Sequence, residues 1–434
     1  MNIKLFPFLK PIKKTFHPPS DKSITHRALF FGAVNKGRTI IKYPLISGDT
    51  KSTINVLKKL GIKIILIGNY LIVDNKNNFV SHEEYIELDC GNSGTTARLL
   101  CGYISTRNGN FVITGDESLT TRPMKRVVDP LKKLGINIRS TNNSLPIYIE
   151  NSSLTKYENI LSTFDVSSAQ VYTSLVLSSL YTNCKIQIFR TKPMRNHTEL
   201  MLKNFDINVE KIKSDNVEYD LISPKIISGN YSINVCGDPS SAAFLIALGL
   251  LVKGSDIYIE NVNVNPTRIT FVNVLIKMGA DISIINTYVV SNELIGSIHV
   301  KYTENLNGIV LNDSNKVSEM LDEIPIFSLI ATQAKGTTKI EDVGELRFKE
   351  SDRIKSIVEL FKSLGVTIIE LSNGLKIEGD QTILGGVVES NNDHRIVMTA
   401  AVASSIAING IEIKDSHIAE VSYPNFFDIF KNYD

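Results

Sequence analysis

The sequence contains no Trp and only four Cys among its 434 residues. The four thiols are Cys90, Cys101, Cys184 and Cys236. None forms a CxxC pair, and no disulfide framework is visible, so buried thiols in a reducing cytoplasm are the simpler interpretation. His26, His197 and His394 are not part of an HxxH or HxxxH pattern. We therefore expect no metal site and interpret these histidines as hydrogen-bonded structural side chains.

A long apolar run and a strong charge imbalance are also missing. The longest apolar stretch, Ala242–Val252, is too short to span a bilayer. The basic first residues lack a long apolar segment and a small-residue cleavage site, so we expect no signal peptide. The net charge is +2, which does not favour nucleic-acid binding, and any cationic site must be local. An apolar fraction of 43% and this length indicate a globular protein of two or three domains.

One arrangement of residues recurs six times along the chain. Each copy opens with a short polar or charged cluster, continues as a helix-like run of small apolar residues, and breaks before a β-rich strand. The openings start 71, 75, 71, 84 and 71 residues apart. They are Asp21-Lys22-Ser23, Asn92-Ser93-Gly94-Thr95, Ser167-Ser168-Ala169-Gln170, Asp238-Pro239-Ser240-Ser241, Asp322-Glu323-Ile324-Pro325 and Asp393-His394-Arg395. A period of this length indicates that each copy is a complete supersecondary unit.

The six copies divide naturally into two groups of three. Most copies carry a second, amphipathic helix that ends in a turn, as in the KKLGIKI segment at residues 58–64. We therefore predict an α/β protein of two pseudo-threefold domains with a cleft between them. The predicted domains are residues 18–236 and residues 1–17 plus 237–434. Because helix N-termini attract anions, six helix starts with basic residues nearby favour an anion-binding site.

The segment from His17 to Arg27 is the first candidate for this site. It places Lys22, Ser23 and Arg27 at a helix start, and this combination of an ammonium, a hydroxyl and a forked guanidinium suits phosphate or carboxylate. A capped surface helix with solvated basic side chains explains the segment equally well.

Two further segments contribute a glycine and an arginine as candidates for the anion-binding site. The block from Asp89 to Arg98 includes Gly94, but it has neither a Walker Lys-Ser/Thr pair nor a dinucleotide fingerprint. A tight turn with an N-cap is the competing interpretation. Arg122 precedes Pro123, which we place at the first position of a helix, so Arg122 would project from that helix start. A structural ion pair with Asp116 or Glu117 is the alternative.

The densest charged run extends from Glu345 to Ile354. At helical spacing, Lys349 and Arg353 would share a face, and a solvated helix face is the usual explanation of such a run. However, Asp322 opens the fifth copy and Arg395 lies at the opening of the sixth. Acidic and basic side chains at several helix starts indicate an acid–base and anion-binding site.

These segments together resemble one enzyme family. The blocks are, in order, SDKSITHRAL, GNSGTTARLL, GDESLTTRPM, SSAQVYTSLVL, GDPSSAAF, DEIPIFSLIA, ELRFKESDRI and DHRIVMTAA. They are similar to those of 5-enolpyruvylshikimate-3-phosphate synthases over nearly the whole chain. The resemblance implies two domains, each of three βαβαββ units (an inside-out α/β barrel), in agreement with the repeat.

The resemblance also implies a reaction and its site residues. The enolpyruvyl group of phosphoenolpyruvate would pass to the 5-hydroxyl of shikimate 3-phosphate with release of phosphate, in the pathway to chorismate and aromatic amino acids, without metal or organic cofactor. Asp322, Glu350 and Lys22 would be catalytic. Shikimate 3-phosphate would bind to Lys22, Ser23, Arg27, Ser168, Gln170, Arg195, Asp322 and Lys349. Phosphoenolpyruvate would bind to Lys22, Gly94, Arg122, Gln170, Arg353 and Arg395. We expect a cytoplasmic monomer with no nucleic-acid or membrane partner.

Several residues bear on the branch of the family. The Ser168-Ala169-Gln170 and Asn265-Pro266-Thr267-Arg268 segments look like the glyphosate-tolerant class II branch. That branch usually has a basic residue in place of Tyr172 and Gly in place of Ser20. The other branch has Lys in place of Val421, so one possible phosphate contact is missing here. It has Asn in place of Glu345, and we therefore do not assign Glu345 to the site.

Two other functions compete with this interpretation. The sister enolpyruvyl transferase, which acts on UDP-N-acetylglucosamine, usually places a Cys in the loop occupied here by residues 115–124, and this loop has none. A non-catalytic scaffold with a repeated fold gives no reason for Lys22, Arg122 and Arg395 to converge.

Overall fold

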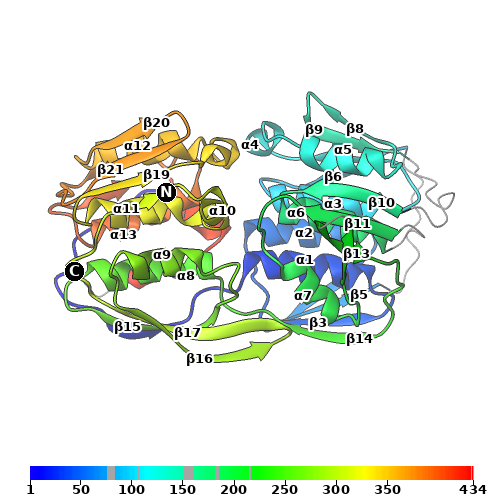
Figure 1. Ribbon diagram of the computed structural model, residues 1–434, viewed down its shortest axis with the longest axis horizontal. Coiled ribbons are helices and arrows are strands. Elements are labelled where there is room, and N and C mark those ends of the chain that lie inside the picture. Colours follow the sequence, from blue (N-terminus) through cyan, green and yellow to red (C-terminus); the bar gives the residue numbers. More distant parts are fainter. Residues whose placement is uncertain are drawn as a thin grey trace. The chain divides into compact units, whose positions relative to one another are not determined.

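The computed structural model describes residues 1–75, 84–105, 107–150, 161–180, 185–214, 217–431 and 433. The chain forms two compact units. Unit 1 comprises Met1–Pro19, Cys236–Val289 and Leu294–Asp434, and unit 2 comprises Ser20–Val235 and Val290–Glu293. The chain crosses between the units beside the two predicted boundaries. Val290–Glu293 belongs to unit 2, which the repeat did not indicate. This segment forms the turn between the strands labelled β16 (Ile282–Val290) and β17 (Glu293–Lys301) in Figure 1.

Within its described residues, unit 2 contains three four-stranded sheets of one design, in which a parallel strand pair is extended by an antiparallel hairpin. The sheets, in spatial order, are β14 (Asn230–Asn234), β3 (Arg38–Lys42), β5 (Tyr70–Asp74) and β4 (Lys63–Ile67); β6 (Ile86–Asp89), β7 (Phe111–Thr114), β9 (Ser144–Ile149) and β8 (Ile138–Thr141); and β10 (Leu161–Val166), β11 (Lys185–Arg190), β13 (Val217–Ile222) and β12 (Glu210–Ser214). The helices are α1 (Lys22–Val34), α2 (Gly48–Lys59), α3 (Gly94–Ile104), α4 (Glu117–Thr120), α5 (Lys125–Lys133), α6 (Ala169–Ser179) and α7 (His197–Lys203).

Unit 1 repeats this design in its described residues, with one shorter sheet. Its sheets are β16 (Ile282–Val290), β17 (Glu293–Lys301), β15 (Asp256–Asn263) and β2 (Lys13–Phe16); β18 (Val310–Leu311), β19 (Thr337–Ile340), β21 (Gly374–Glu378) and β20 (Ile368–Leu371); and β1 (Ile3–Leu5), β23 (Ile411–Ile413) and β22 (Gly386–Val388). Its α-helices are α8 (Pro239–Leu251), α9 (Thr270–Lys277), α10 (Ser314–Glu319), α11 (Ile324–Thr332), α12 (Arg353–Ser363) and α13 (His394–Ser404). Its 3₁₀ turns are η2 (Leu321–Glu323), η3 (Gly344–Phe348), η4 (Ser416–Val421) and η5 (Phe426–Phe430).

The predicted fold of two pseudo-threefold α/β units is therefore confirmed, with one departure in the sixth repeat. There, η4 and η5 follow β23 in place of the second helix and hairpin, and β1 from the start of the chain pairs with β23. The predicted return of the first strands to the second group is also seen, since β2 pairs in parallel with β15.

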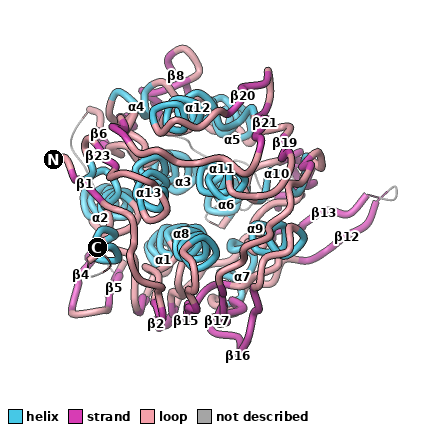
Figure 2. Tube along the Cα trace, turned by 90° about the vertical axis from the view of Figure 1, so that its left-hand side faces the viewer, coloured by secondary structure: helices cyan, strands magenta, loops and turns pink. Residues whose placement is uncertain are grey.

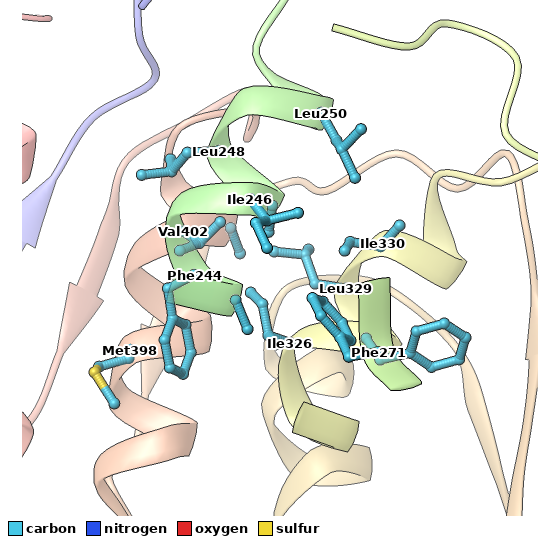
Figure 3. Packing of buried hydrophobic residues seen from close by; sticks show 14 of the residues in the cluster. Phe244, Ile246, Leu248, Leu250, Phe271, Ile326, Leu329, Ile330, Met398 and Val402 are labelled. Carbon is cyan, nitrogen blue, oxygen red and sulfur yellow. The ribbon is translucent and has the colours of Figure 1, made fainter. Parts of the chain in front are cut away.

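The first helix of each repeat is buried inside its unit. In unit 1, α8, α11 and α13 contact one another and are enclosed by the sheets (Figure 2). Their apolar side chains form one core, in which Phe244 and Leu248 of α8 pack with Ile326 of α11 and Met398 of α13 (Figure 3). In unit 2, α1, α3 and α6 contact one another in the same way. A helix surrounded by other elements is apolar on every side, which explains runs such as residues 242–251.

Small residues allow two of these helices to approach closely. A Cβ atom on Gly102 of α3 would lie 1.9 Å from the backbone oxygen of Ser174 in α6, far inside van der Waals contact. On Gly32 of α1, the nearest atoms would be side-chain carbons at 3.3 Å. Only Gly is compatible with the observed α3–α6 distance.

We predict that Gly102→Ala lowers the free energy of unfolding by at least about 1–3 kcal/mol, because α3 and α6 must move apart. Gly32→Ala is the matched control and should cost less, since a side chain can shift and Ala favours a helix by about 1 kcal/mol. Urea unfolding of both variants measures the difference. Equal losses would contradict this account of the α3–α6 contact.

Candidate active site

Polar residues cap the helices that carry the predicted site residues. In unit 2, the Asp21 carboxylate accepts the Ile24 N–H at 2.8 Å, and α1 begins at Lys22. Ser93 accepts the Thr96 N–H at 3.2 Å, and α3 begins at Gly94. Each cap satisfies one amide of the first turn, and the dipole of the helix favours an anion beside its start.

Arg27 connects α1 with the starts of α6 and α7. It is 2% exposed and donates to Thr198 Oγ1 at 3.0 Å, to the Ala169 oxygen at 3.2 Å and to the Ser23 oxygen at 3.1 Å. These neutral oxygens orient the guanidinium in a fixed geometry. Ser168 is the residue before α6, so its backbone also lies at this helix start.

Arg98 and Gln170 connect α3 with α6. Arg98 Nη1 donates to Gln170 Oε1 at 2.9 Å, and Gln170 Nε2 donates to Thr95 Oγ1 at 3.0 Å. Gly94 lies against the cationic side chains, since a Cβ built on it would be 3.0 Å from Arg98 Nη1 and 3.4 Å from Arg122 Nη1. A side chain at Gly94 would therefore crowd these two guanidinium groups.

Arg122 lies between α4 and α5. Pro123 is not the first residue of a helix as predicted, because α5 begins at Lys125 after Met124. The guanidinium is held from α3 and α4 instead: Nη2 donates to Asn92 Oδ1 at 2.5 Å and to Ser118 Oγ at 3.1 Å. The side chain nevertheless reaches the start of α3, as its distance from Gly94 shows.

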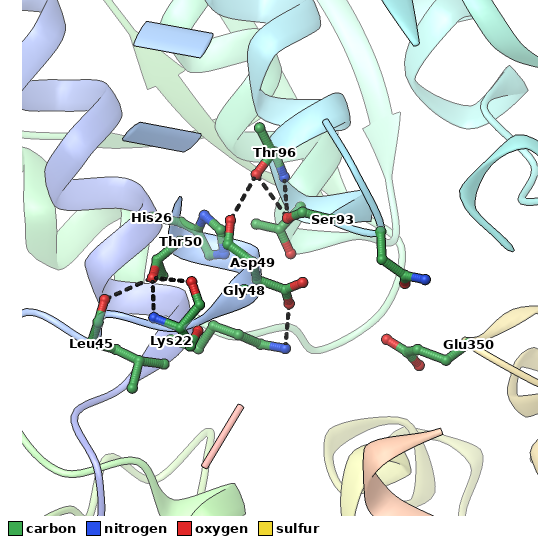
Figure 4. Close-up of polar contacts among 12 residues, drawn as sticks. Lys22, His26, Leu45, Gly48, Asp49, Thr50, Ser93, Thr96 and Glu350 are labelled. Carbon is green, nitrogen blue, oxygen red and sulfur yellow. Dashed lines mark hydrogen bonds and ion pairs between the residues drawn. The ribbon is translucent and has the colours of Figure 1, made fainter. Parts of the chain in front are cut away.

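Lys22 lies at the start of α1 beside α2. Its Nζ donates to Asp49 Oδ2 at 2.7 Å (Figure 4). Nearby, the buried His26 shares a hydrogen bond with Thr53 at 2.8 Å. Burial, with the positive charges of Lys22 and Arg27, holds the pKa of His26 well below its usual value of 6.5. The imidazole is therefore neutral at pH 7.

In unit 1, Arg353 lies at the centre of three carboxylates. Its guanidinium is 1% exposed and donates to Asp393 Oδ2 at 2.7 Å, to Asp322 Oδ1 at 3.4 Å and to Glu350. Burial acts to lower the pKa of Arg353, but the three carboxylates outweigh it and raise the pKa overall. Burial acts to raise the pKa of Asp393, but the charge and hydrogen bond of Arg353, together with His394, outweigh it and lower the pKa overall. Arg353 thus fixes Asp322 and Glu350 next to each other.

The predicted helical face shared by Lys349 and Arg353 is wrong. The chain forms the 3₁₀ turn η3, is extended at Lys349, and starts α12 only at Arg353. The break follows from Asp352, which caps α12 by accepting the Lys355 N–H and also binds Arg347 at 2.8 Å. Lys349 still approaches Arg353, since its Nζ donates to the same Asp322 Oδ1 at 3.2 Å.

Arg395 lies in the first turn of α13. Its backbone N–H is bound by Asp393 at 2.9 Å, and its side chain is almost buried, with 6% of the residue exposed. Across the described ranges, the Arg395 guanidinium has no hydrogen-bond or ion-pair partner. A nearly buried positive charge without a protein partner favours an anionic ligand.

The remaining predictions concern Arg195, the cysteines, a metal site and membrane-spanning helices. Arg195 lies in the segment just before α7, and its role in the site stays a prediction. Cys184 lies outside the described residues, whereas Cys90, Cys101 and Cys236 are buried free thiols. In the part of the chain that the structure describes, no group of three or more His, Cys, Asp or Glu side chains could hold a metal ion. No helix there is long and apolar enough to cross a membrane.

Three residues beside the predicted site were not assigned from the sequence. Asp49 holds Lys22, Arg98 holds Gln170, and Asp393 holds Arg353. The position of Arg98 four residues after Gly94 in one helix was a usable signal, because such residues share a face. Asp49 follows a loop and carried no comparable pattern.

The profile described as "EPSP synthase (3-phosphoshikimate 1-carboxyvinyltransferase)" matches residues 9–430. The 3-phosphoshikimate 1-carboxyvinyltransferase of Caldicellulosiruptor saccharolyticus is 40% identical, over 99% of this chain and 98% of the relative. The protein of the same name from Petrotoga mobilis is 41% identical over 95% of each chain.

Solved structures agree with these matches. The EPSP synthase of Acinetobacter baumannii superimposes with a TM-score of 0.84 at 31% identity, covering all of this chain and 98% of the other. The enolpyruvyl transferase NikO from Streptomyces tendae superimposes with a TM-score of 0.75, covering all of this chain and 97% of that one. At 12% identity, this second likeness concerns the fold alone.

The low pKa of His26 predicts a pH dependence of stability. In the unfolded chain, the imidazole takes up a proton below about pH 6.5, whereas folded His26 stays neutral to lower pH. The unfolded state then binds more protons, so the free energy of unfolding should fall by up to about 1.4 kcal/mol per pH unit below that value. His26→Asn does not titrate and should show a shallower decrease between about pH 7 and pH 5 in urea unfolding. Identical slopes would show that His26 titrates normally in the folded protein.

Proposed function

The chain belongs to the EPSP synthase (3-phosphoshikimate 1-carboxyvinyltransferase) family, and on this premise we propose that it transfers the enolpyruvyl group of phosphoenolpyruvate to the 5-hydroxyl of shikimate 3-phosphate. The observation that carries this proposal is the group formed by Asp322, Glu350, Lys349 and Arg353, in which two cations hold two carboxylates at the start of a helix. Such a group can move protons while it binds an anion.

Shikimate 3-phosphate binds to unit 2 in this proposal. Lys22 and Ser23, at the start of α1, with Arg27 behind them, suit a phosphate group. Gln170 is oriented by Arg98 and Thr95, and it hydrogen-bonds the same substrate. Ser168 and Arg195 complete the unit 2 part of the predicted set, to which Asp322 and Lys349 of unit 1 also belong.

Phosphoenolpyruvate uses the cations of both units. Arg122 and Gly94 at the start of α3 bind it from unit 2, with Lys22 and Gln170. From unit 1, Arg395 supplies the charge, because its guanidinium has no partner among the described residues. Arg353 is also in the predicted set, and its three carboxylate contacts support an additional role in orienting Asp322 and Glu350.

The reaction needs two proton transfers. One goes to the methylene carbon of phosphoenolpyruvate and is later reversed, and the other removes the proton of the 5-hydroxyl. Glu350 as an acid, aided by Lys22, gives a proton to the methylene carbon of phosphoenolpyruvate, and the adjacent carbon becomes electrophilic. The 5-hydroxyl oxygen bonds to that carbon while its proton passes to Asp322. A methyl proton then returns to Glu350, the double bond re-forms, and the carbon–oxygen bond to phosphate breaks. The proton held by Asp322 leaves with the phosphate or to solvent, which restores the carboxylate. Lys349 holds Asp322 in place for the attack.

The proposed site residues of unit 1 form one half site and those of unit 2 the other. Both half sites must act on one pair of substrates in this mechanism. Cations repel one another in the absence of anions, so bound substrates favour the arrangement that brings the half sites together and excludes water. The monomeric state, the cytoplasmic location and the independence from cofactors stay predictions.

A phosphate-release assay tests the proposed function. The purified protein should release phosphate when phosphoenolpyruvate and shikimate 3-phosphate are both present, and neither substrate alone should suffice. Replacing shikimate 3-phosphate with UDP-N-acetylglucosamine should abolish turnover. Turnover with the nucleotide sugar would identify the sister transferase, and no turnover with either acceptor would favour a scaffold.

We predict that Asp322→Ala lowers kcat by about 10²–10⁴-fold, since a general base acts in the transition state. The KM values should change little, and Arg353 keeps its contacts with Asp393 and Glu350, so the variant should fold. Steady-state kinetics measure both parameters. A variant that turns over normally but binds substrate poorly would reverse the role assigned to Asp322.

We predict that Arg122→Ala chiefly raises KM for phosphoenolpyruvate, by about 10–100-fold, because hydrogen bonds to charged groups are worth about 1.5–3 kcal/mol. Arg126→Ala is the matched control, since Arg126 is exposed in α5. KM for shikimate 3-phosphate should stay within about threefold of wild type, well below that loss. A selective loss of kcat at unchanged KM would place Arg122 outside the phosphoenolpyruvate site.

A further inference from the structure

A buried series of hydrogen bonds connects α1, α2 and α3 inside unit 2. Its end at Thr96 and Ser93 is seen in Figure 4. The series begins at His26, whose Nδ1 lies 2.8 Å from Thr53 Oγ1. Thr53 Oγ1 lies 2.7 Å from Thr96 Oγ1, and Thr96 Oγ1 donates to Ser93 Oγ at 2.7 Å. His26, Thr53 and Thr96 are all 0% exposed, and Ser93 is 1% exposed. The mechanism above uses none of these four side chains.

The number of hydroxyl protons determines the direction of donation along this series of hydrogen bonds. Each hydroxyl has one proton, and Thr96 donates its own to Ser93 at 2.7 Å and more weakly to the Asp49 oxygen at 3.4 Å. Thr96 has no proton left for Thr53, so Thr53 must donate to Thr96. Thr53 then has only an acceptor left for His26, and Nδ1 must carry the imidazole proton. The opposite direction would place the proton on Nε2, which is buried and has no hydrogen-bond partner in the described residues. A buried N–H without an acceptor is rare, so the Nδ1–H tautomer is favoured.

The series of hydrogen bonds that begins at His26 ends at Ser93, the N-cap of α3. Ser93 Oγ accepts both the Thr96 hydroxyl and the Thr96 N–H, and Gly94 follows at once as the first residue of the helix. The space beside Gly94 is narrow, because Arg98 and Arg122 approach it closely. A small shift of this turn would therefore change the position of the helix amides relative to both guanidinium groups.

We propose that His26 is a positioning residue for phosphoenolpyruvate: as the Nδ1–H tautomer, it orders the hydroxyl chain through Thr53 and Thr96 and thereby holds Ser93 and Gly94 at the start of α3. The inference rests on the proposed function and deepens it, because His26 touches no substrate and acts only through the anion-binding turn.

The tautomer is measured on the protein alone. Long-range ¹⁵N–¹H correlation spectra distinguish Nδ1–H from Nε2–H imidazoles, and the signal missing from His26→Asn identifies His26. The inference requires a neutral Nδ1–H ring at pH 7. An Nε2–H ring, or a protonated one, would overturn it.

Matched pairs of variants test the role in binding. His26→Leu removes the donor and Thr53→Val removes the hydroxyl, whereas His26→Asn keeps an N–H at the δ position and Thr53→Ser keeps the hydroxyl. We expect His26→Leu and Thr53→Val each to raise KM for phosphoenolpyruvate by about tenfold, a loss typical of one hydrogen bond, with kcat within about twofold. His26→Asn and Thr53→Ser should restore KM. The double variant His26→Leu/Thr53→Val should lose no more than either alone, since both break one chain.

Thermal unfolding of each variant separates this role from a general loss of structure. A lowered Tm with unchanged KM, an Asn variant as impaired as the Leu variant, or additive losses in the double variant would each overturn the inference. If His26→Leu does not fold, the Thr53 pair gives the same comparison. Inactive wild-type protein would refute the proposed function, whereas active wild type with unaffected variants would refute only the role of His26.

Discussion

A positive charge that is almost buried needs a partner, and this requirement shapes both half sites. In unit 1, Arg353 satisfies it with Asp322, Glu350 and Asp393, so the carboxylates proposed for proton transfer are fixed by the same contact. In unit 2, the hydrogen bonds of Arg27 and Arg122 described above go to neutral oxygens, which orient each guanidinium. The carboxylates proposed for proton transfer therefore lie in unit 1, whereas cations proposed to bind anions lie in both units.

The repeat places these charges where a helix dipole adds to them. α1, α3, α11, α12 and α13 each begin at or beside a proposed site residue, and polar caps hold Lys22, Gly94 and Arg395 in the first turn. The buried apolar bodies of these helices set the position of their starts, as the close approach of Gly102 to Ser174 illustrates. Packing in the core and geometry in the site are thus coupled through the length of one helix.

The sequence predicted the parts of this arrangement that depend on periodicity. The six repeats, the buried small-residue helices and the polar residue at each helix start follow from spacing and capping. The run from Glu345 to Ile354 was wrongly interpreted as one helical face, because helical spacing alone does not reveal that Asp352 caps a new helix. Asp49 was missed because its contact with Lys22 joins two helices, and such a contact leaves no local pattern. Arg353 was assigned to substrate binding, and its three carboxylate contacts could be found only from coordinates.

The account depends most on the claim that residues of both units bind one phosphoenolpyruvate molecule. A crystal structure of the Asp322→Ala variant with shikimate 3-phosphate and phosphoenolpyruvate tests it directly, because slow turnover would preserve both substrates. We expect Arg122 and Arg395 to contact the same phosphoenolpyruvate, with the phosphate of shikimate 3-phosphate at Lys22 and Ser23. Phosphoenolpyruvate held by residues of only one unit would contradict the account.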